Sequence, residues 1–590
     1  CEDGIQRGDS GSLVVHDNPK ISRKFLGIIL GFDNCSTGNY LGVITQEQIK
    51  IALKVLEPKY KIETNVFDGI ELATHSELYP VFKIKQELFE SPYPGQGISK
   101  TSGFKKSPIF GVFPVETQPA IQQINDDRIP PNSRHYLSVS LNKSIGIKEP
   151  TFSIEEEKFM KNCLRKIFLG INGINTSRLF STNEAIMGVR MKGSKSIDVS
   201  TSAGLPYKLQ KNVQGKKPFI VFDEKEKCWH IQPVVHFDVK CYESVYDNLQ
   251  VPVNLKLEFR KKELVGENKI LEPKTRTVGT GNMIHQIVYM KIFKDFYTKV
   301  KNVWDYGGAT PFALGIDPER HWDQLSSHLQ FLDCVLDYDV KTWEEKICQK
   351  LMYLSADVKI DLLKRFHIMR GEHPPDIDRK VYGMIVDYMD TYVVFENVLY
   401  RKRNGLLSGH PGTLMENSEI HIMIICLICY RILLKLKPEW AVVEFILQHV
   451  KFIVAADDVC IAFSKIVRSL ITAERIREEY LKLGFEITAA DKSHNISTKS
   501  ILDVQFLKHT FGYHQGEFFA KPNDSIIFQL FNWIRSDAKL SDLEQFHTNL
   551  ENAFRFAFWL GETKYEEIRE KANINLAKLN FEWSYDYEQM

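Results

Sequence analysis

The chain contains 590 residues, 43% of them hydrophobic and 26% charged, which excludes a disordered protein and leaves room for several domains or one large enzyme. Its 76 Lys and Arg residues nearly balance 75 Asp and Glu residues, so any binding of nucleic acid depends on local clusters rather than on an overall positive charge. No apolar run reaches the roughly 18 residues of a membrane span. Apart from Cys426 and Cys429, the ten cysteines lack paired spacing, which favours a reducing compartment over a disulfide scaffold.

The first hundred residues differ from the rest. Residues 1 to about 55 contain three short β-prone runs, SLVVH, FLGIILGF and YLGVIT, separated by Gly, Asn and Asp turns. A mixed region and a loop or linker, ESPYPGQGISKTSG, follow. From about residue 105 onward, helix and strand signals alternate without an internal repeat, which is typical of one large α/β unit. Because the chain starts at Cys1 rather than Met, we expect it to be a piece cut from a longer precursor.

Two acidic stretches stand at the ends of apolar runs. In CVLDYDVKTWEEKI, Asp339 follows a β-prone lead-in, which indicates a strand that delivers carboxylates to a site. In KFIVAADDVCIAF, the pair Asp457 and Asp458 interrupts an apolar run, which predicts a tight hairpin. Acids brought together from two such strand ends are what a two-Mg²⁺ phosphoryl-transfer centre needs, and bound cations would offset the cost of placing charges among apolar strands.

The first acidic stretch also has two simpler interpretations. Taken alone, the stretch around Asp339 is equally well explained by a solvated acidic turn. A calcium loop is disfavoured because its glycine is missing and because Cys348 stands where its terminal acid belongs, counting from Asp337.

Glycines and basic residues lie between and around these acids. GLLSGHPGTLMENSEIH leads from a loop that contains Ser408 into an apolar helix, and an ordinary glycine-rich helix start is the alternative. Lys492 follows a strand in FEITAADKSH, and Lys508 lies in VQFLKHTF. The stretch FRKKELVGENKILEPKTRTVGTG carries basic residues suited to a triphosphate, namely Lys261, Lys262, Lys269, Lys274 and Arg276.

Two helices near the carboxyl end have readable boundaries. Ser541 and Glu544 form a capping-box pattern, and Gly561 is expected as the C-cap of the helix that they start. A second helix, TAERIREEYLKLG, is expected to end at Gly484, before a β-prone run.

The order of these motifs resembles that of the RNA-dependent RNA polymerases of picorna-like positive-strand RNA viruses, including the insect iflaviruses and dicistroviruses, over most of residues 105–515. TSAGLPY is similar to the template-entry motif, KKELV with the later KTR to the basic fingers motif, and DVKTWE to the first catalytic motif, which begins at Asp339. SGHPGTLMENS, AADD, ADK and FLKH are similar to the next four motifs, and SGFKKSPIFGVFPVETQPA to the amino-terminal segment of the insect-virus enzymes. The resemblance implies an α/β (α+β) right-hand fold with fingers at about 105–330, a palm on an antiparallel sheet at about 331–515 and a thumb at about 516–590, after a linker and amino-terminal segment at 61–104.

The resemblance also implies roles for single residues. Asp339, Asp457 and Asp458 would hold two Mg²⁺ ions, for which Mn²⁺ is a substitute, and Lys492 would be the general acid for departing pyrophosphate. The residues that would contact the nucleotide are Lys261, Lys269, Arg276, Glu344, Ser408, Thr413 and Asn417. The residues that would contact RNA are Thr201, Ser202, Lys274 and Lys508. The implied partners are an RNA template and primer, ribonucleoside triphosphates, a protein primer of the VPg kind and viral replication proteins, at membrane-associated replication complexes in the host cytoplasm.

The sequence departs from the family pattern at three places. Glu344 stands where the family has aspartate, so its carboxylate reaches about one methylene further. Ala455 and Ala456 replace Tyr and Gly, and a positive φ at the second alanine would strain the turn. Val265 takes a position often held by arginine.

The amino-terminal sequence GDSGSLVV resembles the nucleophile loop of chymotrypsin-like proteases, which directly precede the polymerase in picorna-like viruses. Ser10 would be the nucleophile, where the viral enzymes usually have cysteine. In that fold the histidine base and its orienting group precede the nucleophile, and nine residues cannot contain them. We therefore expect residues 1–60 to be the carboxyl-terminal, all-β fragment of a protease, inactive alone.

Two other functions remain open from the sequence, a reverse transcriptase and a polymerase-like protein that binds RNA without catalysis. A zinc site at Cys426, Cys429 and His421 is disfavoured, because an apolar helix with buried free cysteines explains the spacing more simply. His410 and His509 are expected to be hydrogen-bonded structural groups.

Overall fold

The computed structural model describes residues 102–590 apart from positions 124, 132–148, 211–212, 214, 224, 226–227, 249, 253–254, 397, 491–495 and 537–539, and it describes the backbone of six short strands before them. These strands are β1 (Leu13–Val15), β2 (Phe25–Phe32), β3 (Asn39–Gly42), β4 (Ile70–Glu71), β5 (Lys83–Ile84) and β6 (Leu88–Glu90). β1, β2 and β3 form one antiparallel sheet, which confirms the three strands expected there. Ser10 and Lys492 lie outside the described residues.

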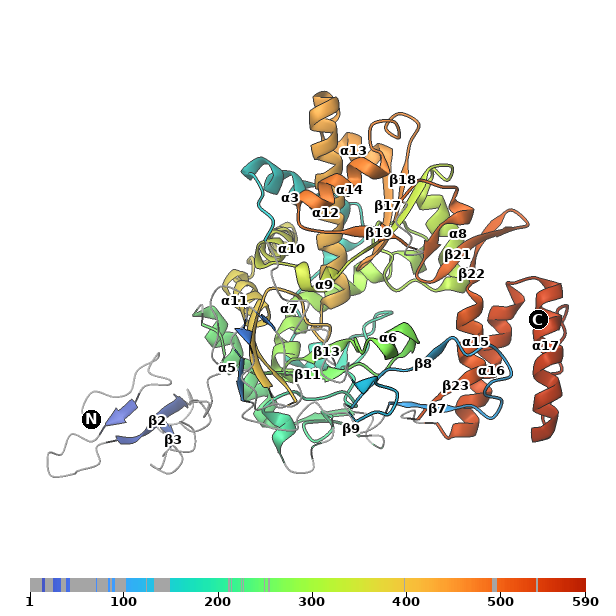
Figure 1. Ribbon diagram of the computed structural model, residues 1–590. Helices are drawn as coiled ribbons and strands as arrows, with labels where there is room; N and C mark the ends of the chain where they lie inside the picture. Colours follow the sequence, from blue (N-terminus) through green and yellow to red (C-terminus); the bar gives the residue numbers. More distant parts are fainter. Residues whose placement is uncertain are drawn as a thin grey trace.

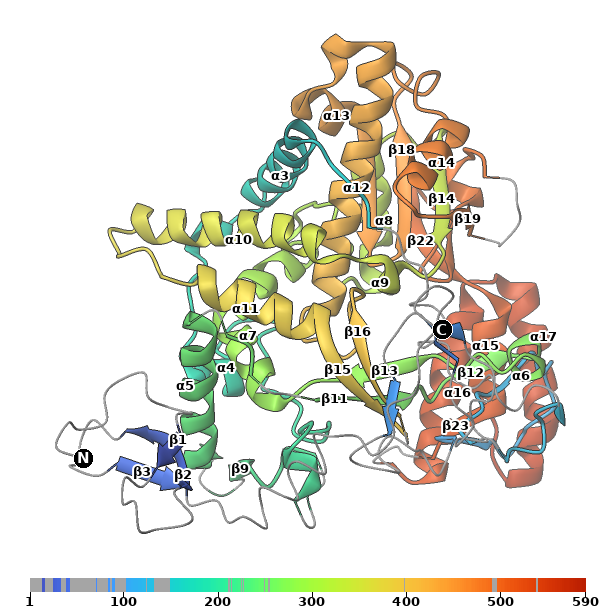
Figure 2. The same ribbon diagram turned by 60° about the vertical axis from the view of Figure 1, so that its left-hand side comes forward.

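A four-stranded antiparallel sheet forms the upper part of the molecule in Figures 1 and 2. Its strand order is β17 (Val450–Ala455), β18 (Asp458–Phe463), β14 (Val335–Val340) and β19 (Ile487–Ala489). Because nearly every residue of β17 and β18 is buried, both faces of this sheet are covered, and α12 (Thr413–Leu436), α14 (Ala473–Lys482) and α8 (Pro318–Leu329) pack against it. The antiparallel sheet expected between residues 331 and 515 is confirmed.

A second sheet of five strands lies below the first in Figure 2. Its order is β13 (Thr277–Thr280), β11 (Lys256–Arg260), β15 (Asp390–Phe395), β16 (Val398–Arg403) and β6. β11 and β15 run parallel, and the other neighbours are antiparallel. The helices α5 (Pro233–Asp247), α7 (Met283–Lys301) and α11 (Asp378–Met389) pack on one another beside this sheet.

Helix α12 connects the two sheets. Figure 2 shows it running alongside the four-stranded sheet, with its amino-terminal end beside β16 and α9 (Trp343–Lys346). Its residues from Met415 to Cys429 are all buried, and Cys426 and Cys429 pack within the apolar core as expected. The helix therefore brings the loop before it to the end of β14, where the first acidic stretch lies.

The carboxyl-terminal helices are joined to the amino-terminal part of the described chain. α15 (Asp524–Asn532), α16 (Asp542–Phe558) and α17 (Glu562–Leu576) form a separate apolar cluster. β7 (Phe104–Lys106) pairs with β23 (Trp533–Arg535), and the two strands lie side by side in Figure 1. Ile109 and Phe113 enter that cluster, where the Phe113 ring stacks on Phe531 at 4.4 Å between centroids. Segments from opposite ends of the sequence thus share one core.

The predicted helix boundaries are mostly confirmed. Ser541 caps α16 with the full capping box, and α14 ends just before Gly484, whose φ is +82°. The expectation for Gly561 is wrong, because α16 ends at Phe558 with Trp559 as C-cap and Gly561 precedes α17.

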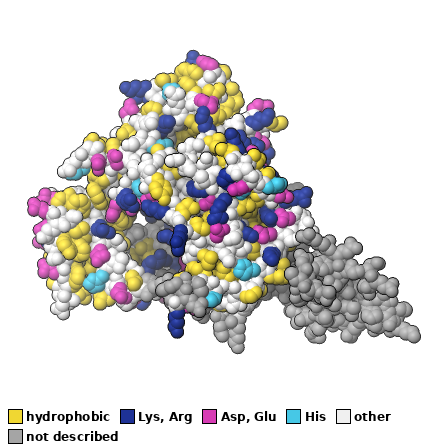
Figure 3. Space-filling view, turned by 180° about the vertical axis from the view of Figure 1, so that it is seen from behind, with side chains coloured by type: hydrophobic (Ala, Val, Ile, Leu, Met, Phe, Trp, Pro, Cys, Tyr) yellow, Lys and Arg dark blue, Asp and Glu magenta, His cyan; other side chains and the backbone are white. Residues whose placement is uncertain are grey.

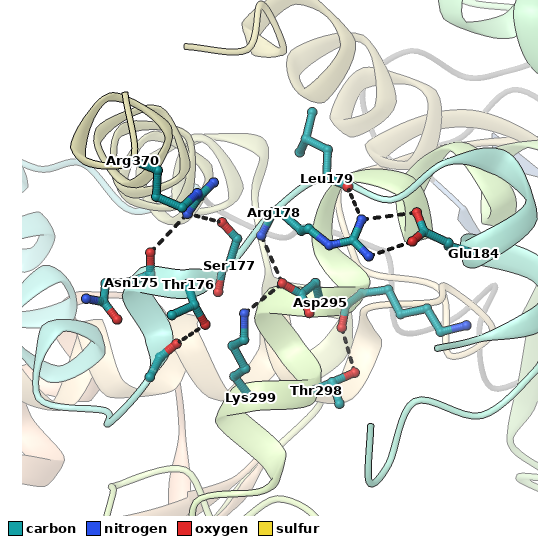
Figure 4. A network of polar contacts seen from close by, with 12 residues as sticks. Asn175, Thr176, Ser177, Arg178, Leu179, Glu184, Asp295, Thr298, Lys299 and Arg370 are labelled. Carbon is teal, nitrogen blue, oxygen red and sulfur yellow. Dashed lines mark hydrogen bonds and ion pairs between the residues drawn. The ribbon is translucent and has the colours of Figure 1, made fainter. Parts of the chain in front are cut away.

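A polar network ties the segment before α4 (Thr182–Met187) to its neighbours (Figure 4). Asp295 of α7 is buried, and its carboxylate accepts the backbone N–H of Arg178 at 2.9 Å and pairs with Lys299 at 2.8 Å. The Arg178 guanidinium pairs with Glu184, and Arg370 donates to the carbonyls of two residues just before Arg178. These contacts fix an irregular segment that has few backbone partners of its own.

The remaining named elements are α3 (Ile154–Leu169), α6 (Asn268–Leu271), α10 (Gln349–Met369), α13 (Val443–His449), β8 (Thr117–Pro119), β9 (Ile220–Asp223), β10 (Cys228–Ile231), β12 (Leu264–Gly266), β20 (Gln505–Phe506), β21 (His509–His514) and β22 (Glu517–Pro522). Among the described residues, no helix combines the length and apolar character needed to cross a bilayer.

Candidate active site

The second acidic stretch forms the hairpin that its sequence predicts. β17 and β18 pair up to Ala455 and Asp458, which leaves Ala456 and Asp457 as the turn. The flanking strand residues are buried, whereas both aspartates are exposed at the tip. The hairpin therefore presents two carboxylates outside the apolar sheet rather than within it.

The turn is strained and is held from outside. Ala456 has φ +60°, a left-handed conformation that costs an L-residue about 1–2 kcal/mol. Its N–H donates to Ser418 Oγ at 2.8 Å, and its carbonyl oxygen lies 2.8 Å from Nδ1 of His421. Because a carbonyl can only accept, His421 donates from Nδ1, and its Nε2 accepts from the hydroxyl of Tyr480 at 3.0 Å. Burial lowers the pKa of His421 to about 4, so the ring is neutral as this arrangement requires.

Asp339 lies beside this turn although it is distant in the sequence. β14 pairs with β18 through Tyr338 and Val459, so the next residue along β14 reaches the level of Asp458. Partial desolvation and the nearby carboxylates of Asp457 and Asp339 raise the pKa of Asp458 to about 6. The three acids therefore share one electrostatic environment, as the sequence predicts.

A cavity of about 360 Å³ contains most of the predicted nucleotide-binding residues. Figure 3 shows a hollow on the face opposite to that of Figure 1, with Lys and Arg side chains near its rim. The carboxylates that line the cavity belong to Glu258, Asp339, Glu344, Glu345 and Asp457. The cationic side chains that line it belong to Lys261, Arg276, Lys341 and Lys402. Because acids outnumber bases, a polyphosphate would enter this cavity most favourably together with cations.

The basic wall comes from the five-stranded sheet. The backbone N–H of Lys261 donates to the carbonyl of Arg276 at 2.7 Å, which holds the two cations together just after β11 and just before β13. Hydrogen bonds to Glu263 raise the pKa of Arg276, and the carboxylates of Glu344 and Asp457 add to this effect. Arg276 thus remains charged and faces the acids across the cavity.

Two of the predicted phosphate contacts lie elsewhere. Lys274 pairs with Glu272 at 2.7 Å on the exposed surface, and Lys269 lies on α6; neither lines the cavity. Their spacing in the sequence placed them with Arg276, but the turn of α6 carries them away from it. The prediction that Lys269 contacts the nucleotide is not supported by its position in this conformation.

The loop before α12 is fastened to α9. Ser408 donates from Oγ to Glu344 Oε2 at 2.9 Å, and the Leu406 N–H donates to the Glu344 carbonyl at 2.9 Å. Thr413 donates from its hydroxyl to the carbonyl of His410 at 2.7 Å, so it braces the loop rather than facing the cavity. Gly409 has no room for a side chain, because an added Cβ would lie 1.8 Å from the carbonyl oxygen of Gly279.

Asn417 is fully buried on the first turns of α12, and both polar atoms of its side chain lack a hydrogen-bond partner among the described residues. Buried amides are rarely left unsatisfied, so such a group often marks a place where a ligand or water binds.

The predicted RNA contacts are spread over two places. Thr201 donates to the Asp198 carbonyl at 2.8 Å and accepts from Lys216, and Ser202 Oγ accepts the Gly204 N–H at 3.1 Å, in the segment between α4 and β9. Lys508 lies close enough to Asp458 to counter part of the rise in its pKa. The lone histidines are structural as expected, since His410 lies 3.2 Å from Glu416 and His509 bonds to the Leu507 carbonyl.

Several lining residues were not predicted, chiefly Lys402, Glu258 and Thr277. The alternation in YRKR places Lys402 on one face of β16 and its arginine neighbours on the other, but it does not tell which face is buried.

The family model for viral RNA-dependent RNA polymerase matches residues 114–574. The chain belongs to this family. It is 26% identical over 518 residues to the genome polyprotein of simian hepatitis A virus genotype V, covering 84% of this chain and 21% of the polyprotein. It is 24% identical over 473 residues to that of human rhinovirus 1B, covering 78% of this chain and 19% of the polyprotein. The polymerase thus spans about a fifth of the length of these relatives.

A solved structure supports the fold. The Sicinivirus 3Dpol RNA-dependent RNA polymerase matches 84% of this chain and 96% of its own with a TM-score of 0.67 and 20% identity. The expected picorna-like polymerase fold is confirmed, and the reverse transcriptase and binding-only alternatives are not favoured. The protease fragment and the domain boundaries stay predictions.

Polymerases of this family generally depend on divalent metal ions. Among the described residues no three His, Cys, Asp or Glu side chains form a ready metal cage. Carboxylates at one cavity wall fit Mg²⁺ nevertheless, because this ion is usually bound by one or two carboxylates together with substrate phosphates.

Proposed function

We propose that this chain extends an RNA or protein-linked primer with ribonucleotides on an RNA template, through two Mg²⁺ ions, and so replicates and transcribes a viral genome. The observation that carries the proposal is that one cavity brings together Asp339 and Asp457, the cations Lys261 and Arg276, and the Glu344–Ser408 pair.

The acids are proposed to hold the metal ions. Asp339 and Asp457 line the cavity, and Asp458 stands beside them on the hairpin. Bound metal would lower the pKa of the primer 3′-hydroxyl and neutralise charge on the reacting phosphate. The strained turn fixes where these carboxylates point, since Ser418 and His421 hold its backbone on both sides.

The opposite wall is proposed to bind the triphosphate. Arg276 and Lys261 would contact phosphate oxygens, and a guanidinium can do so with two parallel hydrogen bonds. The Arg276 guanidinium pairs with the Glu263 carboxylate, so nucleotide binding would partly exchange one anion for another.

The sugar is proposed to contact Glu344 and Ser408 at the cavity wall, and Asn417, which is fully buried and does not line the cavity, is proposed as a third contact. Glu344 and Ser408 already share a hydrogen bond, and Asn417 has unsatisfied donors and acceptors. A ribose 2′-hydroxyl both donates and accepts, and it is the group by which RNA is distinguished from DNA.

The finer assignments rest on the relatives alone. They are Lys492 as general acid, Mn²⁺ as a substitute metal, RNA contacts at Thr201, Ser202, Lys274 and Lys508, a VPg-like primer and replication complexes on host membranes in the cytoplasm. Viral replication proteins as partners are a proposal of the same kind.

Primer extension with the full chain tests the proposal. Labelled ribonucleotides, Mg²⁺ and a homopolymer RNA template with a complementary RNA primer should give incorporation that Asp457→Asn abolishes. The control is Asp333→Asn, an exposed acid that pairs with Arg468 outside the cavity and should leave incorporation unchanged. Preference for deoxynucleotides, or retention of RNA without incorporation, would contradict the proposal.

A further inference from the structure

A buried lysine lies in the wall of the nucleotide cavity without a role in the chemistry described above. Lys402 is only 2% exposed, and its Nζ lies 2.7 Å from Glu345 Oε2, itself 11% exposed. Burial alone would lower the pKa of a lysine, yet the carboxylates of Glu345 and Glu258 raise that of Lys402. It is therefore a fixed positive charge among acids at the cavity wall.

Lys402 pairs with Glu345, which is next to Glu344, the residue proposed to contact the sugar. Glu345 and Glu344 are consecutive residues of α9, a helix of four residues whose N-cap makes no side-chain hydrogen bond. Such a short helix has little stability of its own, so its position depends on contacts outside it. Lys402 supplies one of these contacts from β16.

Backbone contacts extend the same junction. The Gly405 N–H donates to the Ile347 carbonyl at 2.7 Å, and Leu406 donates to the Glu344 carbonyl. The loop passes directly over the ion pair, since a Cβ on Gly405 would lie 2.9 Å from Lys402 Cε and 3.0 Å from Glu345 Oε2. The ion pair thus lies beneath the place where the loop carrying Ser408 meets α9.

A third carboxylate adds to the charge around the lysine. Glu258 is 2% exposed and accepts hydrogen bonds from Thr277 and Tyr400, so it remains in place whether or not Lys402 is present. Without Lys402, the carboxylates of Glu258, Glu344 and Glu345 would line the same cavity with no buried cation among them. Such a wall would repel an incoming triphosphate.

We propose that Lys402 is a positioning residue that fixes Glu344 and Ser408 for recognition of the ribose, by anchoring Glu345 beneath them. This rests on the proposed function of the cavity. The role is distinct from contact with substrate, because the Lys402 ammonium is occupied by Glu345.

The test compares Lys402→Met with the double variant Lys402→Met/Glu345→Gln in the full chain. The single variant leaves Glu345 buried and unpaired, and we expect KM for ribonucleotides to rise about tenfold while kcat changes by less than about threefold. We also expect the preference for ribonucleotides over 2′-deoxynucleotides to fall about tenfold, because the sugar contacts lose their fixed position. Removing the unpaired charge in the double variant should restore KM to within about threefold of the wild type, but only part of the sugar preference.

Lys256→Met is the matched control. Lys256 is a fully buried lysine of the same sheet that pairs with Asp387 at 2.9 Å and does not line the cavity. The Lys256→Met variant should lose at least as much thermal stability as Lys402→Met, while KM and the sugar preference of its folded fraction stay unchanged. A merely structural role for Lys402 would give the same result as this control, and that outcome would overturn the proposal.

A binding measurement separates this proposal from the proposed function. Competition of GTP and dGTP against a fluorescent ribonucleoside triphosphate reports the sugar preference without any turnover. If wild-type chain binds GTP over dGTP and Lys402→Met reduces that ratio, the positioning role holds even where no incorporation is detected. If the ratio is unchanged, or if wild-type chain shows no preference, the positioning role is wrong whether or not RNA is made.

Discussion

The two main sheets place their charged residues differently. Strands β17 and β18 of the four-stranded sheet are apolar and place Asp457 and Asp458 at the exposed tip of their hairpin, although β14 of the same sheet buries Asp337 against Lys499. The five-stranded sheet buries a row of charges in its interior, where alternate residues of β11 are Lys256, Glu258 and Arg260, each at most 4% exposed. Removing a charge from the hairpin should therefore affect catalysis, whereas removing one from the buried row should affect stability.

The buried charges of the second sheet are all compensated. Lys256 pairs with Asp387 and Arg260 with Glu396 at 2.5 Å, while two hydroxyls bind Glu258. A buried pair adds little net stability over apolar residues of similar volume, but loss of one partner is expensive because the other charge stays buried.

The largest expected effect is therefore at Asp387. Asp387→Asn should lower the free energy of unfolding by about 3–5 kcal/mol, because Lys256 is left buried without its carboxylate. Urea unfolding followed by circular dichroism measures the change. The exposed pair Lys166–Glu444 provides the control, since Glu444→Gln should change stability by less than about 1 kcal/mol. Equal losses in the two variants would contradict the comparison.

The same sheet should make stability depend on pH. His285 is fully buried against Asp387, and burial lowers its pKa to about 4. Since the unfolded histidine has a pKa near 6.5, the unfolded chain binds the additional proton between these values, and stability falls as the pH falls from about 6.5 to 4. The contribution lost is on the order of 3 kcal/mol.

The variant His285→Gln isolates this contribution. It should be less stable than wild type at neutral pH but should lose less stability between pH 6.5 and 4, as measured by urea unfolding across that range. A pH dependence as steep as that of wild type would show that other groups cause it.

Substitution in the exposed hairpin should have the reverse effect, namely a loss of activity with little loss of stability. Asp457→Asn should abolish incorporation yet change the free energy of unfolding by less than about 1 kcal/mol, because the carboxylate is exposed and its repulsion by Asp458 opposes its attraction to Arg276. Thermal unfolding beside primer extension gives both values. A large loss of stability would mean that the hairpin acids are structural.

The smallest expected effect concerns the strained turn. Ala456→Gly removes a penalty of about 1 kcal/mol for positive φ but adds a similar entropy cost in the unfolded chain, so stability should rise by less than about 1 kcal/mol. Ala455→Gly, at the end of β17, has no such strain to relieve and should be destabilising. Denaturant unfolding of both variants in parallel decides whether the strain is real.

The sequence was sufficient to predict those elements whose form depends on the local residue pattern and on the order of motifs along the chain. The hairpin at Asp457, the strand that ends near Asp339 and the loop leading into α12 all follow from periodicity, turn residues and motif order. The roles of these residues in metal and nucleotide binding remain predictions.

The buried ionic face of the second sheet could not be predicted in the same way. The alternation in LKLEFR indicates a strand with one charged face, and such a face normally meets solvent. Here Asp387, Glu396 and the carbonyl of Gln122 cover it from distant parts of the chain. For the same reason Lys402 was missed, because side-chain direction there depends on contacts that single-sequence patterns do not contain.

The pairing of β7 with β23 has a consequence for cleavage of the chain. Ile109 and Phe113 complete the apolar cluster of α15, α16 and α17, so these helices finish folding on residues from a distant part of the sequence. A protease that cut before residue 104 would leave this junction whole, whereas one that cut just after residue 113 would expose apolar surface at the far end of the chain. The two cuts would then differ in how well the helices α15, α16 and α17 resist digestion.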